Sequence, residues 1–178
     1  MALNVIELND RGIKVGDESG IIVQSPGFAL VVDDKLEVGE TAEQQARLRP
    51  TNSFNKYWHD LNLEPISHGN KFRHYADLAY AQLVHLAEVW EINNDVIFAV
   101  PGNFSRQQLA ILLGLAQQSP FTTVGVVDSA LAATATAAQS EHIVFADIQL
   151  HQVLLTKKKN SVSTPTMIAT TTKGLRMR

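Results

Sequence analysis

Few side chains in this sequence are arranged for chemistry. It contains no cysteine, which excludes disulfides, cysteine-ligated metals and thiol catalysis. Its six histidines show no compact metal-ligand spacing, and it has no Gly-x-Ser-x-Gly elbow and no Walker-type loop. The remaining candidates are acidic side chains at or near the ends of expected strands, namely Glu7, Asp10, Asp128 and Asp147. Carboxylates can position a cation or move a proton, although Asp128 can equally be a helix cap.

The charges are distributed unevenly along the chain. No acidic residue follows Asp147, whereas six basic residues do, which are Lys157, Lys158, Lys159, Lys173, Arg176 and Arg178. Such a stretch can bind nucleic acid or another anion, or it can be a solvated hairpin turn at residues 157–160 followed by a strand end. We favour the turn, because no aromatic side chains interleave these charges as a stacking surface for bases requires. Nucleic acid is therefore not an expected partner.

The bulk properties are those of a globular protein. The 178 residues are 45% hydrophobic and 19% charged, enough for one buried core or for one domain and a fragment of another. No apolar run approaches the roughly 20 residues that span a bilayer, and no basic stretch followed by an apolar segment marks a secretory signal. We therefore expect a cytoplasmic protein without a membrane partner.

The N-terminal part has the pattern of β-structure. Short apolar or alternating runs, separated by Asn, Asp, Gly and Pro, predict strands at residues 3–8, 12–15, 20–24 and 28–32. Thr41 is then expected to cap a short helix that continues to Arg47 and ends before Pro50.

The pattern then changes to the helical period. Apolar residues three and four apart predict a long helix over residues 72–90, and a continuous apolar run at 95–100 predicts a strand covered on both faces. Ser105 and Gln108 form a capping-box signature for a helix that stops before Pro120. The remaining elements expected are a buried strand at 123–127, a small-residue helix at 129–139 capped by Asp128, and strands at 142–146, 149–156 and 161–172. This order predicts an α/β fold, a mixed sheet with helices on its faces.

Three segments in this order resemble the nucleotide-binding domain of seventy-kilodalton heat-shock chaperones and their actin and sugar-kinase relatives. They are residues 95–108 (DVIFAVPGNFSRQQ), 123–133 (TVGVVDSALAA) and 38–47 (VGETAEQQAR), the last followed by Pro50 and Asn52. The resemblance covers residues 4–156. It implies a ribonuclease H-like (actin-like ATPase) fold with a first lobe over residues 1–139 and strands of an incomplete second lobe over 140–178.

The resemblance also implies where a nucleotide would lie. In that family two glycine-rich hairpins hold the phosphates of ATP or ADP with magnesium. The residues at the matching positions are Glu7, Asn9, Asp10, Arg11 and Gly12 in the first hairpin, Asp147 in the second, and Asp128 at the magnesium-positioning site. If the family geometry holds, the two hairpins face each other and Glu7 and Asp147 can meet as paired carboxylates.

Both hairpins depart from the family pattern. The first lacks the family's Gly-Thr-Thr, and the second, residues 147–152 (DIQLHQ), keeps the aspartate but no glycine. Close backbone approach to a phosphate favours glycine, which has no Cβ, and Asp10 would set a negative charge against the phosphates. We therefore predict no catalytic residues, and a non-catalytic, divergent chaperone-like or actin-like domain that acts through protein contacts. The alternative is a nucleotide-binding domain with altered loops, in which Arg11 replaces lost donors.

Two further expectations concern partners. The chain reaches only the start of the family's second lobe, so it is expected to be the N-terminal part of a longer protein or to have dispensed with that lobe. Unpaired C-terminal strands would then contact a protein partner, the missing lobe or a second copy of the chain. Tyr57, Trp58 and His59 could form a contact patch, but packing of Tyr57 or Trp58 in the core is the favoured interpretation.

Overall fold

The computed structural model describes residues 3–66, 72–92, 95–135 and 142–159. Its strands are β1 (Leu3–Glu7), β2 (Ile13–Asp17), β3 (Gly20–Ser25), β4 (Ala29–Val32), β5 (Lys35–Val38), β6 (Ser53–Phe54), β7 (Asp95–Val100), β8 (Thr122–Asp128), β9 (His142–Ile148) and β10 (Val153–Lys159). Its helices are α1 (Glu40–Ala46), the single 3₁₀ turn η1 (Pro50–Asn52), α2 (Tyr75–Val89), α3 (Arg106–Gln117) and α4 (Ser129–Ala135). The predicted boundary at residue 139 and the predicted strand at 161–172 lie outside the described residues.

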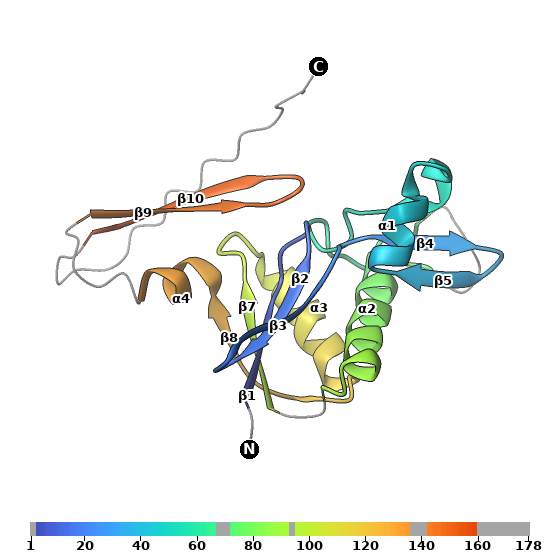
Figure 1. The fold of residues 1–178 in the computed structure, drawn as a ribbon. Helices are drawn as coiled ribbons and strands as arrows, with labels where there is room; N and C mark the ends of the chain where they lie inside the picture. The colour runs from blue at the N-terminus through green and yellow to red at the C-terminus, as the bar shows by residue number, and fades with distance from the viewer. Residues whose placement is uncertain (1–2, 67–71, 93–94, 136–141, 160–178) are drawn as a thin grey trace.

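A five-stranded mixed sheet organises the molecule, with strand order β3-β2-β1-β7-β8 (Figure 1). The hairpins β1–β2 and β2–β3 are antiparallel, whereas β7 lies parallel to β1 and β8 lies parallel to β7. Parallel neighbours need a crossover between them, and the helices α2 and α3 provide it. The change in the sequence from alternating to helical periodicity therefore marks the change from antiparallel to parallel pairing.

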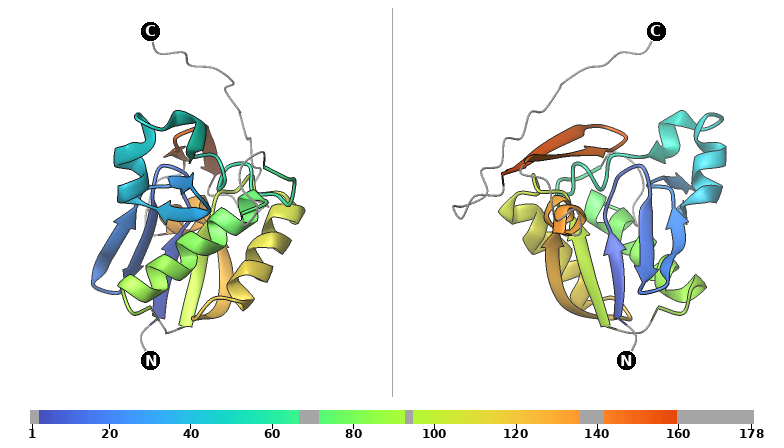
Figure 2. Two further views of the ribbon diagram at one scale, coloured as in Figure 1. Left: turned by 90° about the vertical axis from the view of Figure 1, so that its right-hand side faces the viewer. Right: turned by 60° about the vertical axis from the view of Figure 1, so that its left-hand side comes forward.

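Helices lie on both faces of this sheet, as predicted. The helices α2 and α3 pack side by side on one face, and α4 lies against the other face near the ends of β7 and β8 (Figure 2). A second, three-stranded sheet of order β5-β4-β6 sits with α1 beside the main sheet. The β9–β10 hairpin lies across the end of the main sheet at which β1 runs into β2 (Figure 1).

One polar side chain lies at the centre of the core. Gln82 of α2 is fully buried, and its Oε1 accepts hydrogen bonds from the Tyr57 hydroxyl at 2.6 Å and the Trp58 Nε1 at 2.7 Å. Its Nε2 donates to Ser25 Oγ at 3.0 Å and to the Pro26 carbonyl at 2.8 Å. Burial raises the pKa of Tyr57, so its phenol stays neutral and remains a donor. Gln82 thus ties two loops to α2, and the prediction that Tyr57 and Trp58 pack in the core is confirmed.

The structure corrects where two helices begin. Gly39, not Thr41, is the residue before α1, because its positive φ of 74° turns the chain straight from β5 into the helix. The helix α2 begins at Tyr75 rather than at residue 72, because His74 and Asp77 form a capping box there. The capping box predicted at Ser105 and Gln108 is confirmed.

Two expectations about the C-terminal half are wrong. The chain does not turn at residues 157–159, since β10 continues to Lys159 in antiparallel register with His142. The turn lies instead between Ile148 and Val153, within the segment predicted as a strand. The strand β8 is also not buried on both faces, because it is an edge strand and Val124 and Val126 are 52% and 38% exposed.

The helices of the described residues include none that is both long enough and apolar enough to cross a membrane.

Replacing Gln82 with leucine should destabilise the fold strongly. The change introduces an apolar side chain of similar size and removes the acceptor of the Tyr57 hydroxyl and the Trp58 indole, both buried. Two orphaned buried donors are expected to cost about 2–5 kcal/mol of unfolding free energy, measured by urea denaturation.

The matched control is Gln117→Leu, which makes the same change at an exposed position of α3. Its effect should stay within about 0.5 kcal/mol. Equal effects of the two substitutions would show that the buried hydrogen bonds of Gln82 do not stabilise the core.

Candidate functional site

The candidate site lies where the turns of two hairpins meet. One turn joins β1 to β2 and the other joins β9 to β10 (Figure 1). The side chains of Asn9 and Asp10 in the first turn bond to the backbone at the second. We call the contacts between residues 8–12 and residues 147–152 the latch. The sequence resemblance predicted that these hairpins face each other, and their hydrogen bonds confirm it.

Asn9 shapes the first turn. Its side-chain Oδ1 accepts from the Arg11 backbone amide at 3.0 Å, and its carbonyl accepts from the Gly12 amide at 2.9 Å. The turn also packs closely against the chain after β3, because a Cβ added to Gly27 would lie 2.2 Å from the Asp10 carbonyl oxygen. Glycine at position 27 therefore allows the turn to pack at this depth.

Asp10 makes the central contact of the latch. Its side chain is almost fully buried, and its Oδ1 accepts from the Leu150 backbone amide at 2.5 Å. Its Oδ2 accepts from the His151 amide at 3.2 Å and lies 2.8 Å from Nδ1 of the same residue. Two successive backbone amides and a ring nitrogen thus converge on one carboxylate, an arrangement suited to binding an anion.

A row of side-chain amides leads to the second acidic residue, Asp147. Asn103 Nδ2 donates to Gln152 Oε1 at 2.7 Å, and Gln152 Nε2 donates to Gln149 Oε1 at 2.9 Å. Gln149 Nε2 then donates to Asp147 Oδ2 at 2.7 Å, while Asn9 Nδ2 donates to Asp147 Oδ1 at 3.2 Å. All four amides point their donors toward the carboxylate, so that each hydrogen bond polarises the next.

The charges around the latch are mainly negative. Burial raises the pKa of Asp147, and the nearby carboxylates of Glu7 and Asp10 raise it further, against the hydrogen bond from Gln149 and the charge of Lys14. Lys14 Nζ lies 3.0 Å from Glu7 Oε2, where it forms a half-exposed ion pair. The predicted pair of Glu7 and Asp147 thus interacts electrostatically, while Glu7 bonds to Lys14.

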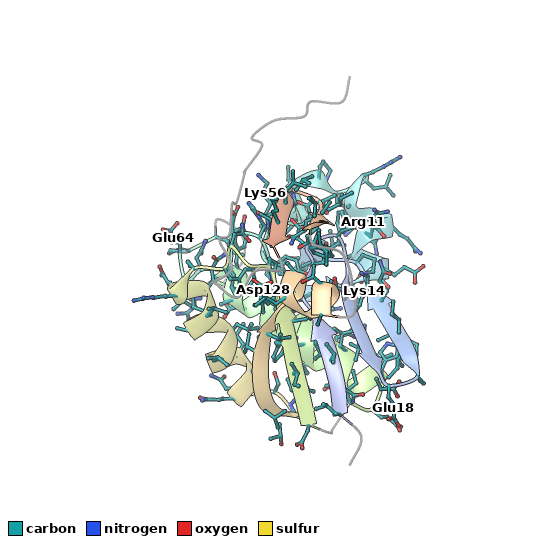
Figure 3. The ribbon with its side chains drawn as sticks, turned by 90° about the vertical axis from the view of Figure 1, so that its left-hand side faces the viewer. Arg11, Lys14, Glu18, Lys56, Glu64 and Asp128 are labelled. Carbon is teal, nitrogen blue, oxygen red and sulfur yellow. The ribbon has the colours of Figure 1, made fainter. Side chains whose placement is uncertain are left out.

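Asp128 has the structural role that the sequence allowed for it. Its Oδ1 accepts from the backbone amides of Ala130 at 2.8 Å and Leu131 at 3.0 Å, which caps α4. Figure 3 shows Asp128, Arg11 and Lys14 toward the hairpin end of the sheet, with Glu18 at the opposite end. The Arg11 side chain is exposed.

Sequence reasoning missed the polar residues that complete the latch. Gln149 and Gln152 are 7% and 6% exposed, and the His151 ring stacks on His59 with centroids 5.8 Å apart. Their only signal in the sequence was negative, since Gln149 and His151 stand where the resembled family has glycines and Gln152 stands where it has threonine. Within the described ranges, no three His, Cys, Asp or Glu side chains are grouped to hold a metal ion.

Comparison with known proteins gives one kind of match. No protein-family model matches the chain, and no curated protein sequence matches it. The solved structures that resemble it include MreB5 of Spiroplasma citri bound to ADP, with a TM-score of 0.68 and 14% identity over 89% of this chain. The same protein bound to AMPPNP gives a TM-score of 0.64 and 14% identity over 88% of this chain.

The chain spans 48% of the length of each of these MreB5 structures. At 14% identity the likeness concerns the fold alone, and it agrees with the resemblance that residues 38–133 carry in the sequence. The chain therefore has an actin-like ATPase fold, with helices on both faces of a mixed sheet.

Proposed function

We propose that this chain is a non-catalytic, actin-like domain that acts through contacts with other proteins. The observation that carries the proposal is that the backbone amides at the two turns donate hydrogen bonds to acceptors within the protein. Those of Arg11 and Gly12 donate to Asn9, and those at positions 149–151 donate to Gln152 or Asp10. Five amides in phosphate-facing positions are thus bonded within the protein.

Asp10 supports the same conclusion through its charge. A phosphate entering the latch would have to displace a buried carboxylate from two amides and a histidine ring nitrogen. It would also approach Glu7 and Asp147, whose charges lie close enough together to raise the pKa of Asp147. Removing a buried carboxylate from its hydrogen-bond donors costs several kcal/mol before any ligand contact forms.

The β9–β10 hairpin supplies a surface for protein contacts. Its outer face carries exposed apolar side chains, including Val144 at 65%, Ile148 at 62% and Leu155 at 45%, with the exposed Lys157 opposite Val144. A two-stranded hairpin is marginally stable alone, and a contiguous apolar face of this kind marks an interaction site. We infer that a protein surface covers this face, and the sequence resemblance to chaperones supports a place within a chaperone-like protein.

The competing function is nucleotide binding through altered loops. It is favoured by the exposed position of Arg11 beside the latch, where a guanidinium could pair with phosphate. The two functions make opposite predictions for the effect of nucleotides on stability.

The first prediction concerns the latch itself. Asp10→Ala removes the shared acceptor of the Leu150 and His151 amides and should lower the unfolding free energy by about 2–4 kcal/mol. Urea denaturation of the 178-residue chain measures the loss. Asp17→Ala is the control, because Asp17 also accepts from a backbone amide but lies exposed at a hairpin. A loss for Asp10→Ala no larger than for the control would mean that the latch does not hold the hairpins together.

A second prediction uses the raised pKa of Asp147. Since the folded protein binds this proton more tightly than the unfolded chain does, the charged carboxylate costs stability above the ordinary pKa of 3.8. Asp147→Asn should therefore stabilise the protein at neutral pH, and the row of amides can reverse its direction to accept the new donor. Solvent screening limits the gain to less than about 1 kcal/mol.

The gain should shrink as the pH falls through the raised pKa of Asp147 toward 3.8 and should vanish below 3.8, where Asp147 is protonated in both states. Urea denaturation midpoints of parent and variant across the acid range measure the difference. If the gain were independent of pH, the stabilisation by Asp147→Asn would come from hydrogen bonding and not from removal of the carboxylate charge.

The third prediction decides between the two functions. Thermal unfolding of the chain should be unchanged by saturating magnesium–ATP or magnesium–ADP. A nucleotide at a hundred times its dissociation constant would add about 2.7 kcal/mol of stability, and for a domain of this size would raise the midpoint by roughly 5–10 °C. A shift of that size that Arg11→Ala abolishes would replace the proposal with the nucleotide-binding function.

A further inference from the structure

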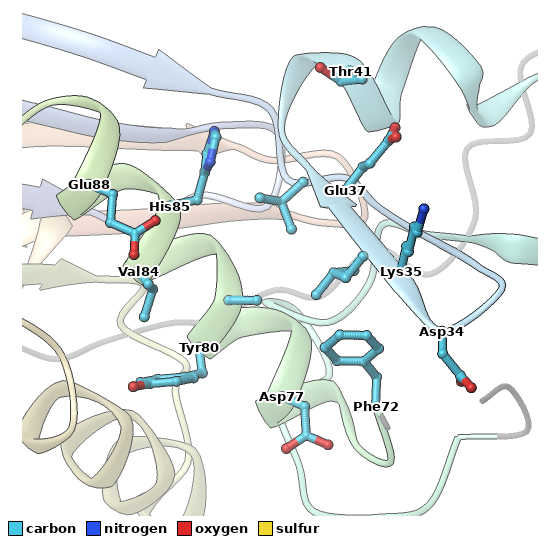
Figure 4. Close-up of a pocket in the computed structure, with 13 residues that line it drawn as sticks. Asp34, Lys35, Glu37, Thr41, Phe72, Asp77, Tyr80, Val84, His85 and Glu88 are labelled. Carbon is cyan, nitrogen blue, oxygen red and sulfur yellow. The ribbon is translucent and has the colours of Figure 1, made fainter. Parts of the chain in front are cut away.

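A groove of about 1000 Å³ lies between the edge strand β5 and the helix α2 (Figure 4). All four residues of β5 line one side, and successive turns of α2 line the other. The groove shares no lining residue with the latch, so its occupant is a separate question from that of nucleotide binding.

One wall of the groove is an open sheet edge. Among the described strands β5 pairs with β4 alone, which leaves its other edge available for main-chain hydrogen bonds. Such an edge is a template for a further strand. Leu36 and Val38 of β5 are half-buried and pack against the core, and they line the groove together with Ala81 and Val84 of α2. The groove thus has an apolar floor beside an unpaired strand.

The rim of the groove is acidic. Glu88 of α2 and Glu37 of β5 lie toward one end in Figure 4, where the Glu37 side chain is directed away from α2 and its Oε2 accepts from Gln45 Nε2 at 2.9 Å, and Asp34 and Asp77 lie toward the other end. Among the described residues that line the groove, Lys35 is the single lysine or arginine. Leaving Asp34 aside, the three carboxylates of Glu37, Asp77 and Glu88 outnumber this ammonium group and favour a positively charged occupant.

We propose that this groove binds an extended, basic segment of a partner protein, which adds a strand to the edge of β5. In an extended segment alternate side chains point to opposite faces, so one set can meet the apolar floor while the other meets the acidic rim. Main-chain hydrogen bonds to β5 supply affinity, and these two kinds of side-chain contact supply specificity. A segment with alternating apolar and basic residues matches the open edge of β5, the apolar floor and the acidic rim.

The direct test uses the 178-residue chain and a labelled, end-blocked peptide of sequence Lys-Val-Lys-Val-Lys-Val-Lys, with binding followed by fluorescence anisotropy. The peptide should bind, more weakly at high salt, and should slow hydrogen exchange at the β5 amides. A glutamate-for-lysine peptide and a peptide with proline as the central residue should both bind at least about tenfold more weakly, because the first loses charge complementarity and the second cannot complete the strand.

Protein variants separate the groove from general electrostatics. The double change Glu37→Lys with Glu88→Lys, both exposed, should weaken binding about tenfold or more. The control Glu18→Lys with Glu64→Lys alters the net charge equally at exposed sites outside the groove and should change binding less than about twofold (Figure 3).

Three results would overturn the proposal: no binding of the lysine–valine peptide, equal binding of the proline peptide, or equal weakening by both pairs of substitutions. Circular dichroism and thermal unfolding of each variant confirm that the fold is kept. Because the groove is separate from the latch, these results do not depend on whether nucleotide binds.

Discussion

The buried carboxylate of Asp10 connects two hairpins whose contact residues are 140 positions apart in the chain. A charge with so little exposure is tolerated only when donors surround it, and here two backbone amides and a histidine nitrogen do so. The position of the β9–β10 hairpin over the main sheet depends on this contact and on the amide row that ends at Asp147. Removing the Asp10 carboxylate while its donors remain, or removing the donors while the carboxylate remains, leaves buried polar groups unpaired.

The same contact explains why the absence of glycines matters. In a glycine-rich hairpin no side chain competes with a phosphate for the backbone amides. Here the side chains of the two hairpins bond to the amides or to one another; they are those of Asn9, Asp10, Gln149 and Gln152. The actin-like fold is therefore kept, and in the proposed function the Asp10 carboxylate stands where that fold would receive an anion. In the core, the side-chain amide of Gln82 likewise forms hydrogen bonds with four polar groups of the protein.

Two surfaces stay open once these polar groups are satisfied. The outer face of the β9–β10 hairpin is apolar, and the groove beside β5 combines an apolar floor with an acidic rim. They differ in chemistry, since the first buries side chains and the second also offers main-chain hydrogen bonds. These two surfaces are the ones that the proposed function and the further inference assign to protein contacts.

The sequence by itself determined the order of the helices and of the strands other than β5 and β6, the capping box at Ser105, the cap at Asp128 and the likeness to an actin-like fold, because these follow from local periodicity and side-chain chemistry. It also predicted Asp10 and Asp147 as site residues, which stays a prediction. It did not reveal that Asp10 binds the backbone and ring of His151, nor that Gln149 and Asn103 belong to a row of amides that ends at Asp147. The exposure of β8 and the groove beside β5 were likewise decided by tertiary structure. Such features depend on contacts between segments distant in sequence, whose geometry no local pattern specifies.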